Sequence, residues 1–280
     1  MGNEKRLLAV YAHPDDESFG TGGTLAKYAA EGVEINLVCA TRGEVGEISD
    51  PSLATPETLG AVREGELRCA AKALGINAPI FLTYRDSGMA NTEENEHPQA
   101  LVNADPQAVI AELVGIIRSL RPDVVLTFEP NGGYGHPDHI AVHQHTVAAF
   151  HAAADAAQYP GQGSAWQAGR LLYSAIPRSF FLEMKTRLEK LGEDTSDLVR
   201  FEESGVGWPD ELVHIVVDVG EAVHQKWAAL QCHATQFGPA NLFRRLPQEM
   251  MLDIMRREAF SQAWPEPAQG VQSGIFGQGE

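Results

Sequence analysis

Two short polar clusters, each directly behind an apolar run, hold the residues of this chain whose types and spacing could do chemistry. The first is His-Pro-Asp-Asp-Glu at 13–17, and the second is Tyr-Gly-His-Pro-Asp-His at 134–139. Together they supply imidazoles and carboxylates, which bind a borderline cation such as zinc and can leave one coordination position open for water. The sequence therefore predicts a metal site built at two strand ends.

The spacing inside the clusters indicates which side chains bind the metal and which stay free. His13 and Asp16 are three residues apart across a turn that contains proline, so both can face one cation while Asp15 points elsewhere. Asp15 is then available as a general base. His139 falls in the expected first turn of the next helix and can supply a third ligand. His136, three residues earlier, would be held about one turn away, where a proton donor is needed.

Other interpretations of these residues are weaker. A single His-Pro-Asp unit can be an ordinary turn, but two such units at two strand ends are harder to dismiss. Glu17 is better explained by the helix dipole, which favours a carboxylate in the first turn. His143 could form a zincin pair with His139, but the glutamate expected after the first histidine is Ile140. Most of the other histidines should be ordinary surface or core residues: His145, His151, His214, His224 and His233.

Three glycines after the first apolar run invite a nucleotide-binding interpretation. Gly20, Gly22 and Gly23 lack the third glycine at the fingerprint spacing, and the preceding turn is filled by charged residues. We therefore expect these glycines to allow close packing of a helix rather than to bind a dinucleotide.

Apolar runs alternate with amphipathic segments for most of the chain, which is typical of parallel strands covered by helices. Strands are expected at 6–12, 34–40, 79–83, 123–128, 170–175 and 213–218. Helices are expected at 17–31, 57–74, 106–120, 138–157, 179–191, 220–235 and near 247–259. The predicted fold class is α/β, a Rossmann-like, mostly parallel sheet flanked by helices. Ligands of such sheets bind beyond the carboxyl ends of the strands, where both clusters fall.

The irregular stretches suggest the domain organisation. Residues 84–105 form a long polar loop after a strand end, which either lines the site or is a surface excursion. We expect a catalytic core at 1–160 that carries both metal motifs. A smaller C-terminal portion at 161–264, which begins in a Gly-, Gln- and Pro-rich linker, should complete the sheet and the substrate pocket. The Gly- and Gln-rich tail at 265–280 is expected to be flexible unless a partner docks it.

Composition narrows the class of partner. The 280 residues are 44% hydrophobic, enough for a large core, and the net charge of −17 argues against a general affinity for nucleic acid or anionic membranes. Small-molecule partners are expected, with a homo-oligomer possible. Three cysteines are too few and too scattered for a disulfide framework. No signal-like segment and no membrane-length apolar run is present, so we expect a soluble cytoplasmic protein.

The two clusters resemble the signature motifs of the PIG-L/LmbE-like family of zinc N-deacetylases. The resemblance covers residues 6–160 well and the remainder loosely, through His-Ala-Thr-Gln at 233–236. Three segments are similar to the mycothiol-pathway branch, which contains the N-acetylglucosaminyl-inositol deacetylase and the mycothiol S-conjugate amidase: 63–67, 85–89 and 131–139. The paired motifs are specific to the family but do not choose among its substrates.

Carried over by position, the resemblance implies a role for each matching residue. His13, Asp16 and His139 would bind Zn²⁺, with Fe²⁺ or another divalent metal as alternatives. Asp15 would be the general base, and His136 the acid that protonates the departing amine.

The resemblance also implies roles for the residues around the metal motifs. Asp138 would tune the acid, and Tyr134 would polarise the substrate carbonyl or the oxyanion. Arg63, Asp86 and Glu47 would hold sugar hydroxyls or the aglycone. The expected activity is removal of the acetyl group from an N-acetylglucosaminyl conjugate. The alternatives are an amidase that cleaves a cysteinyl-glucosamine amide in thiol S-conjugates and, more remotely, a metal- or nucleotide-binding protein without turnover.

Overall fold

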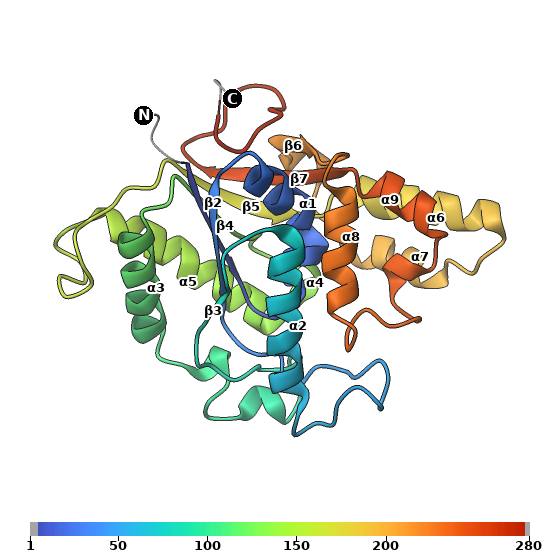
Figure 1. The fold of residues 1–280 in the computed structure, drawn as a ribbon, viewed down its shortest axis with the longest axis horizontal. Coiled ribbons are helices and arrows are strands. Elements are labelled where there is room, and N and C mark those ends of the chain that lie inside the picture. Colours follow the sequence, from blue (N-terminus) through green and yellow to red (C-terminus); the bar gives the residue numbers. More distant parts are fainter. Residues whose placement is uncertain (1–4, 278–280) are drawn as a thin grey trace.

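A single mixed sheet forms the centre of the computed structural model, which describes residues 5–277 (Figure 1). Across the described residues the strand order is β3-β2-β1-β4-β5-β7-β6. The strands are β1 (Arg6–Tyr11), β2 (Glu34–Cys39), β3 (Ile80–Phe81), β4 (Val124–Phe128), β5 (Arg170–Ala175), β6 (Ile215–Asp218) and β7 (Arg257–Trp264). The first five strands in this order are parallel, and β7 pairs antiparallel with both β5 and β6. The predicted α/β class with a mostly parallel sheet is confirmed.

Helices cover both faces of the sheet, as the alternating pattern predicts. The helices are α1 (Asp16–Ala30), α2 (Leu59–Leu74), α3 (Pro106–Leu120), α4 (Gly132–Gly135), α5 (Pro137–Ala154), α6 (Arg178–Leu191), α7 (Ser196–Ser204), α8 (Val223–Cys232) and α9 (Gln248–Ile254). Helices α1, α2 and α8 pack together, and α3 packs on α5 (Figure 1). Because the central strands are covered on both sides, β4 is buried along its whole length.

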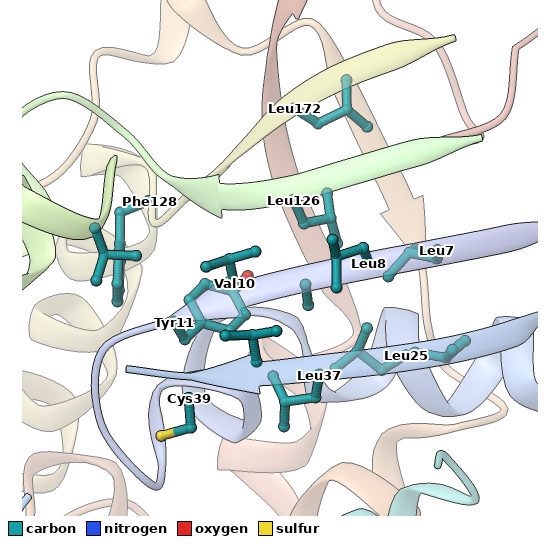
Figure 2. Close-up of a cluster of buried hydrophobic side chains, with 14 of the residues drawn as sticks. Leu7, Leu8, Val10, Tyr11, Leu25, Leu37, Cys39, Leu126, Phe128 and Leu172 are labelled. Carbon is teal, nitrogen blue, oxygen red and sulfur yellow. The ribbon is translucent and has the colours of Figure 1, made fainter. Parts of the chain in front are cut away.

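The core consists of the apolar runs of the central strands. Leu8, Leu37, Leu126 and Leu172 come from four neighbouring strands and have at most 1% of their surface exposed (Figure 2). A second apolar cluster joins the helices that follow β5: Met184, Leu188, Leu198, Trp227, Leu230, Met251, Leu252 and Met255, with others. The C-terminal third therefore has packing of its own while it extends the sheet. The division at residue 160 stays a prediction.

Several helix ends follow the local signals. Helix α2 ends at Gly75, whose φ of 74° is the left-handed cap that glycine favours. Helix α3 begins after Asp105, whose carboxylate accepts the amide hydrogen of Gln107, with proline in the first helical position. The glycines of α1 act in packing, as expected: a Cβ on Gly23 would lie 2.6 Å from Cγ2 of Val219.

The predictions for the C-terminal third are partly wrong. The helix expected near 247–259 ends at Ile254, and the residues after it form β7. Helix α7 was not predicted. Both differences arise because strand pairing between β5 and β6, and packing of α7 on α6, override weak local patterns.

The C-terminal tail also differs from the expectation of flexibility over its described part. Ile275 is fully buried, and its amide donates to the Tyr28 hydroxyl at 3.1 Å. Gln272 forms a backbone bridge beside β6, with its amide 2.9 Å from the carbonyl oxygen of His214. One apolar side chain and a short stretch of pairing thus hold the segment against the sheet. Residues 278–280 lie outside the described residues.

The cysteines form a cross-link that their number and spacing did not suggest. Cys69 in α2 and Cys232 at the end of α8 are disulfide-bonded at a sequence separation of 163, while Cys39 is a buried free thiol. In the described part of the chain, no helix is both long enough and apolar enough to cross a bilayer.

Candidate metal centre

The two polar clusters meet at the carboxyl ends of β1 and β4. The chain leaves β1 at Tyr11, forms a tight turn through His13 and Asp15, and enters α1 at Asp16. It leaves β4 at Phe128, passes through the single turn α4 and enters α5 at Pro137. Since β1 and β4 are adjacent and parallel, both turns fall on the same edge of the sheet.

The three predicted metal ligands lie within contact distance of one another. His13 Nδ1 is 3.2 Å from His139 Nε2, and these two nitrogens lie 3.6 Å and 3.2 Å from oxygens of the Asp16 carboxylate. Donor atoms that share a tetrahedral ion at about 2.1 Å are about 3.4 Å apart. The spacing and the nitrogen and oxygen donor set therefore fit a zinc-like ion.

The remaining nitrogen of each histidine is held by a protein group on the side away from this centre. His13 Nε2 lies 3.2 Å from Asp138 Oδ2 and 3.4 Å from Asp86 Oδ1. His139 Nδ1 lies 3.1 Å from the carbonyl oxygen of Gly132. Such outer partners orient metal-binding imidazoles and fix their tautomers. They leave Nδ1 of His13 and Nε2 of His139 facing the centre.

Two further groupings of buried donors share His13. His136 joins His13 and His139, and Asp86 and Asp138 group around His13, with donor atoms within 4.8 Å in each case. The carboxylates of Asp86 and Asp138 approach the Nε2 side of His13 and also accept backbone or hydroxyl hydrogens, so we regard them as outer partners.

Buried charges within the cluster shift one another's pKa. Burial alone would raise the pKa of Asp16, but His139 and His13 lower it well below its usual value. Burial alone would lower the pKa of His13, but the surrounding carboxylates raise it well above the usual value. The cluster is thus a dense, mutually compensating set of charges, the environment expected of a functional site.

Asp15 lies beside the group formed by His13, Asp16 and His139, and the role of general base stays a prediction. Its side chain is 16% exposed and lies 3.4 Å from the guanidinium of Arg63. Burial raises its pKa to about 6, although Arg63 and His233 act to lower it and Asp16 and Glu17 add to the rise. A carboxylate with this pKa can accept a proton near neutral pH.

His136 caps α5 with its own side chain. Its Nδ1 accepts the amide hydrogen of Asp138 at 3.1 Å, so the ring hydrogen of the neutral form is on Nε2. Burial, together with the positive charges of His13 and His139, lowers its pKa to about 4, and Asp138 opposes the shift. His136 is therefore a neutral hydrogen-bond donor in this environment.

Asp138 is wholly buried, and its carboxylate contacts groups other than the His136 ring. It accepts the backbone amide of Ser87 at 2.9 Å and the Ser87 hydroxyl, besides contacting His13. Its charge does act on His136, in the direction the sequence suggests, but more weakly than burial. Ser87 places the 84–105 loop against the site.

Tyr134 lies over the open side of the cluster. Its side chain is 59% exposed, with its ring centroid 5.2 Å from that of His139 and 6.0 Å from that of His136. The buried carboxylate of Glu129 holds the loop beneath it, because it accepts the amide hydrogens of Asn131 and Gly133 at 2.6 Å. Tyr134 is thus placed to meet a ligand that enters from solvent.

The predicted substrate-binding residues lie in different surroundings. Arg63 is buried and donates to the carbonyl oxygens of Pro14 at 2.6 Å and Gly43 at 2.9 Å. Asp86 is also buried, behind His13. Glu47 is exposed in the loop after β2, and its carbonyl oxygen accepts from Gln236. The structure therefore brings Asp86 to the cluster, joins Arg63 to the base and leaves Glu47 at the surface.

An apolar cavity of about 300 Å³ opens beside the cluster. Asp16, His139 and Tyr134 form one wall. Aromatic side chains from the C-terminal third form much of the rest: Phe181, Phe201, Trp208 and Phe243. The site therefore joins a charged centre to an apolar compartment.

Sequence reasoning missed several residues that support the centre. Ser87 and Gly132 lie in segments that resemble the family, and Glu129 lies just before one of them, but none of the three was assigned a role. The sequence assigns no role to His233, one of five scattered histidines, yet its Nε2 lies 2.8 Å from Glu17 Oε1 beside the first cluster. The available signal was the segment at 233–236, through which the family resemblance extends into the C-terminal third.

Fold and site together define an α/β protein that can hold a metal ion at the carboxyl edge of a parallel sheet. Residues 8–150 match the family described as PIG-L, GlcNAc-PI de-N-acetylase. The chain is similar to the 1D-myo-inositol 2-acetamido-2-deoxy-alpha-D-glucopyranoside deacetylases of Geodermatophilus obscurus, at 39% identity over 93% of this chain and 92% of that one, and of Thermobifida fusca, at 41% over 96% of each.

The fold is also similar to that of a solved structure. The N,N'-diacetylchitobiose deacetylase from Pyrococcus horikoshii gives a TM-score of 0.65 at 20% identity, over 93% of this chain and 84% of that one. The chain belongs to the PIG-L family. The resemblance noted in the sequence is thereby confirmed at the level of family and fold.

Proposed function

We propose that this protein is a zinc-dependent hydrolase that removes the acetyl group from an N-acetylglucosaminyl conjugate. The observation that carries the proposal is the meeting of His13, Asp16 and His139 within 3.6 Å, with Asp15 and His136 beside them. The names of the similar deacetylases support the substrate class. The products would be acetate and a free glucosamine conjugate. Cytoplasmic location and a homo-oligomeric state stay predictions.

His13, Asp16 and His139 would hold the ion, since two imidazoles and a carboxylate are a common zinc set. When bound, zinc would supply Lewis-acid polarisation of the amide carbonyl and make water more acidic. The same donors would also bind Fe²⁺ or another divalent metal, because imidazole and carboxylate groups do not select strongly among them.

Asp15 carries both proton transfers in this proposal, and His136, which the family resemblance implies as the acid, donates a hydrogen bond instead. Asp15 accepts a proton from the attacking water as the new C–O bond forms. Nε2–H of His136 and the hydroxyl of Tyr134 donate hydrogen bonds to the developing oxyanion. The C–N bond breaks as the nitrogen takes up a proton. Asp15 donates that proton, because it has just taken one from the water. His136 is a poorer donor, because its pKa of about 4 leaves the ring neutral.

The apolar cavity favours a second candidate for the substrate. An N-acetylglucosaminyl-inositol leaves few apolar groups to fill a compartment lined by Phe181, Trp208 and Phe243. A thiol S-conjugate with an apolar substituent would fill it, and cleavage of its cysteinyl-glucosamine amide needs the same metal, base and oxyanion donors.

Amine release by the zinc-loaded protein tests both candidates. N-acetylglucosaminyl-inositol, a cysteinyl-glucosaminyl S-conjugate and chitobiose are incubated with wild type and with Asp15→Asn. We expect one of the first two to be turned over, with a loss of about 10²–10⁴-fold in Asp15→Asn at full metal content. Near-normal turnover by metal-loaded Asp15→Asn would contradict the role of Asp15, and no amine from any substrate would contradict the function.

A further inference from the structure

The backbone of Asp15 has a conformation that its own sequence does not favour. Its φ is 120° and its ψ is −28°, well away from the regions that a side chain with a Cβ normally occupies. Residues held in this way persist only where the surroundings fix them. Something beyond the local turn must therefore hold Asp15.

The carboxylate of Glu17 contacts the backbone of Asp15 directly. Oε2 of Glu17 accepts the amide hydrogen of Asp15 at 3.0 Å. Oε1 accepts from the Ser18 hydroxyl and lies 2.8 Å from Nε2 of His233. Glu17 is only 1% exposed, so its charge depends on these partners.

His233 is fully buried and committed to Glu17. Its Nδ1 has no hydrogen-bond partner among the described residues, so Glu17 is the one polar contact the ring makes there. Burial would lower the pKa of His233, but Glu17 raises it. A buried imidazole with this single partner is poorly explained as packing alone.

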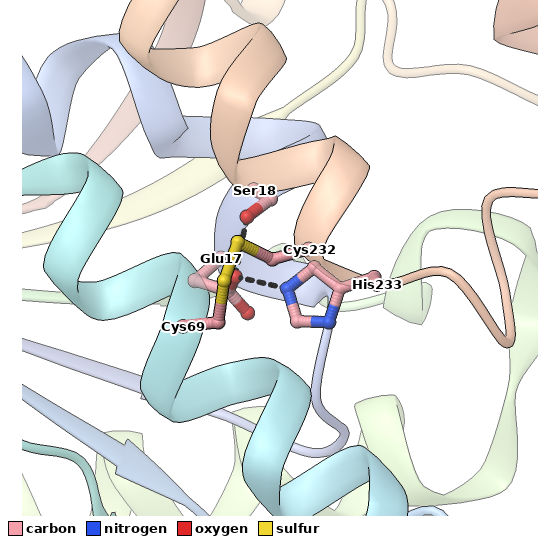
Figure 3. The surroundings of a disulfide bond; sticks show 5 residues. All are labelled: Glu17, Ser18, Cys69, Cys232 and His233. Carbon is pink, nitrogen blue, oxygen red and sulfur yellow. Dashed lines mark hydrogen bonds and ion pairs between the residues drawn. A yellow bond between two sulfur atoms is a disulfide. The ribbon is translucent and has the colours of Figure 1, made fainter.

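Helix α2 anchors the segment that carries His233 at two points. The disulfide between Cys232 and Cys69 lies directly before His233, as Figure 3 shows, and ties α8 to α2. Directly after it, Thr235 donates its amide at 2.8 Å and its hydroxyl at 2.7 Å to the carboxylate of Glu66. His233 is thus fixed from both sides.

We propose that Glu17 and His233 are positioning residues that hold the backbone of Asp15 in its strained conformation, with the Cys69–Cys232 disulfide and the Thr235–Glu66 contact as their anchors. Neither residue belongs to the groupings of potential metal donors among the described residues. The inference rests on the proposed role of Asp15 as general base. It predicts that the pair acts on catalysis only through the placement of Asp15.

Four variants test the pair. Glu17→Met and His233→Leu remove the contacts, whereas Glu17→Gln keeps an oxygen for the Asp15 amide and His233→Gln keeps a nitrogen near the position of Nε2. We expect the first two to lose about 10²-fold in kcat, the effect of a reacting group displaced by about 1 Å, with KM and metal content unchanged. The glutamine variants should recover most of the loss.

A matched control separates this effect from general repacking. His145 is also buried with an unpartnered Nδ1 among the described residues, and it lies in α5, which carries His139. His145→Leu should leave kcat within about threefold of wild type. Cutting both anchors in Cys69→Ser/Thr235→Val should reproduce the loss seen in His233→Leu.

A structural measurement decides the inference independently of turnover. Crystal structures of zinc-loaded Glu17→Met and Glu17→Gln give the φ of Asp15, and hydrogen exchange gives the protection of its amide. We expect φ to relax and protection to fall in Glu17→Met only. An unchanged φ with an unchanged kcat in both Glu17→Met and His233→Leu would overturn the inference. An inactive wild type would count against the proposed function, while φ would still report on the pair.

Discussion

At the scale of single residues, the site depends on which atom of each side chain is already occupied. His13 turns Nε2 toward Asp138 and Asp86, and His139 turns Nδ1 toward a carbonyl oxygen, so one nitrogen of each faces the metal centre. The same reasoning gives His136 its tautomer, because its Nδ1 accepts a backbone hydrogen. The outer contacts are therefore as informative about the chemistry as the motif residues.

Asp138 should affect metal binding more than the pH dependence of turnover. Its carboxylate orients His13, and loss of an outer partner typically weakens metal binding by about 10–100-fold. We therefore expect Asp138→Asn to lose zinc to a competing chelator at a chelator concentration about 10–100-fold lower than wild type requires. If zinc affinity is unchanged and the basic limb of the pH profile of turnover moves to lower pH, the role of Asp138 is instead to raise the pKa of His136.

Arg63 should control the protonation of Asp15. Its positive charge lowers the pKa of Asp15, which burial has raised to about 6, so Arg63→Met should raise that pKa further. Because the base must be ionised, the acidic limb of kcat/KM should move to higher pH. Arg68→Met, which removes an exposed arginine of the same helix, should leave the limb in place. A raised KM with an unmoved limb would show that Arg63 binds substrate, as the family resemblance implies.

At the scale of elements, the parallel half of the sheet could be predicted because its strands are long apolar runs ending in turn residues. The antiparallel half could be predicted only in part. Strand β6 lies where an apolar run was expected to form a strand, but β7 has no alternation, because its five buried residues, Glu258 to Gln262, include three polar side chains. Spacing indicated which motif residues share each turn. It could not show which groups Ser87 and His233 contact, because those contacts span 51 and 216 residues.

The close approach of α1 to the segment after β6 gives a test of packing. A methyl group on Gly23 would lie 2.6 Å from Val219 Cγ2, so Gly23→Ala should lower the free energy of unfolding by about 1–3 kcal/mol. A Cβ on Gly65 in α2 would have no atom of the described residues within 4 Å, apart from its chain neighbours and the backbone of its own helix. Gly65→Ala should therefore raise the free energy of unfolding by about 0.5–1 kcal/mol. Urea denaturation of both variants measures the difference. Equal effects of the same sign would show that α1 can shift to make room.

At the scale of the whole molecule, the site is shared between two regions of different character. The parallel core supplies the metal ligands and the base, whereas the helices after β5 supply the aromatic wall of the cavity. Chemistry and substrate choice are therefore carried by different parts of the chain. A change in the aromatic wall should alter selectivity without altering metal content or the chemical step.

Phe243 and Phe180 allow that separation to be measured. Their rings are 5.8 Å apart, but Phe243 lines the cavity beside the metal centre and Phe180 does not. An apolar pocket discriminates by roughly 10–200-fold per methylene group, so Phe243→Ala should lower kcat/KM for a phenyl or butyl glycoside of N-acetylglucosamine by at least about 10-fold. The inositol conjugate, which presents hydroxyl groups, should change by less than about threefold. Phe180→Ala should lose stability without a change in the ratio of the two kcat/KM values. If Phe243→Ala lowers both values equally, the cavity lies off the path of the aglycone, and its apolar wall serves the fold instead.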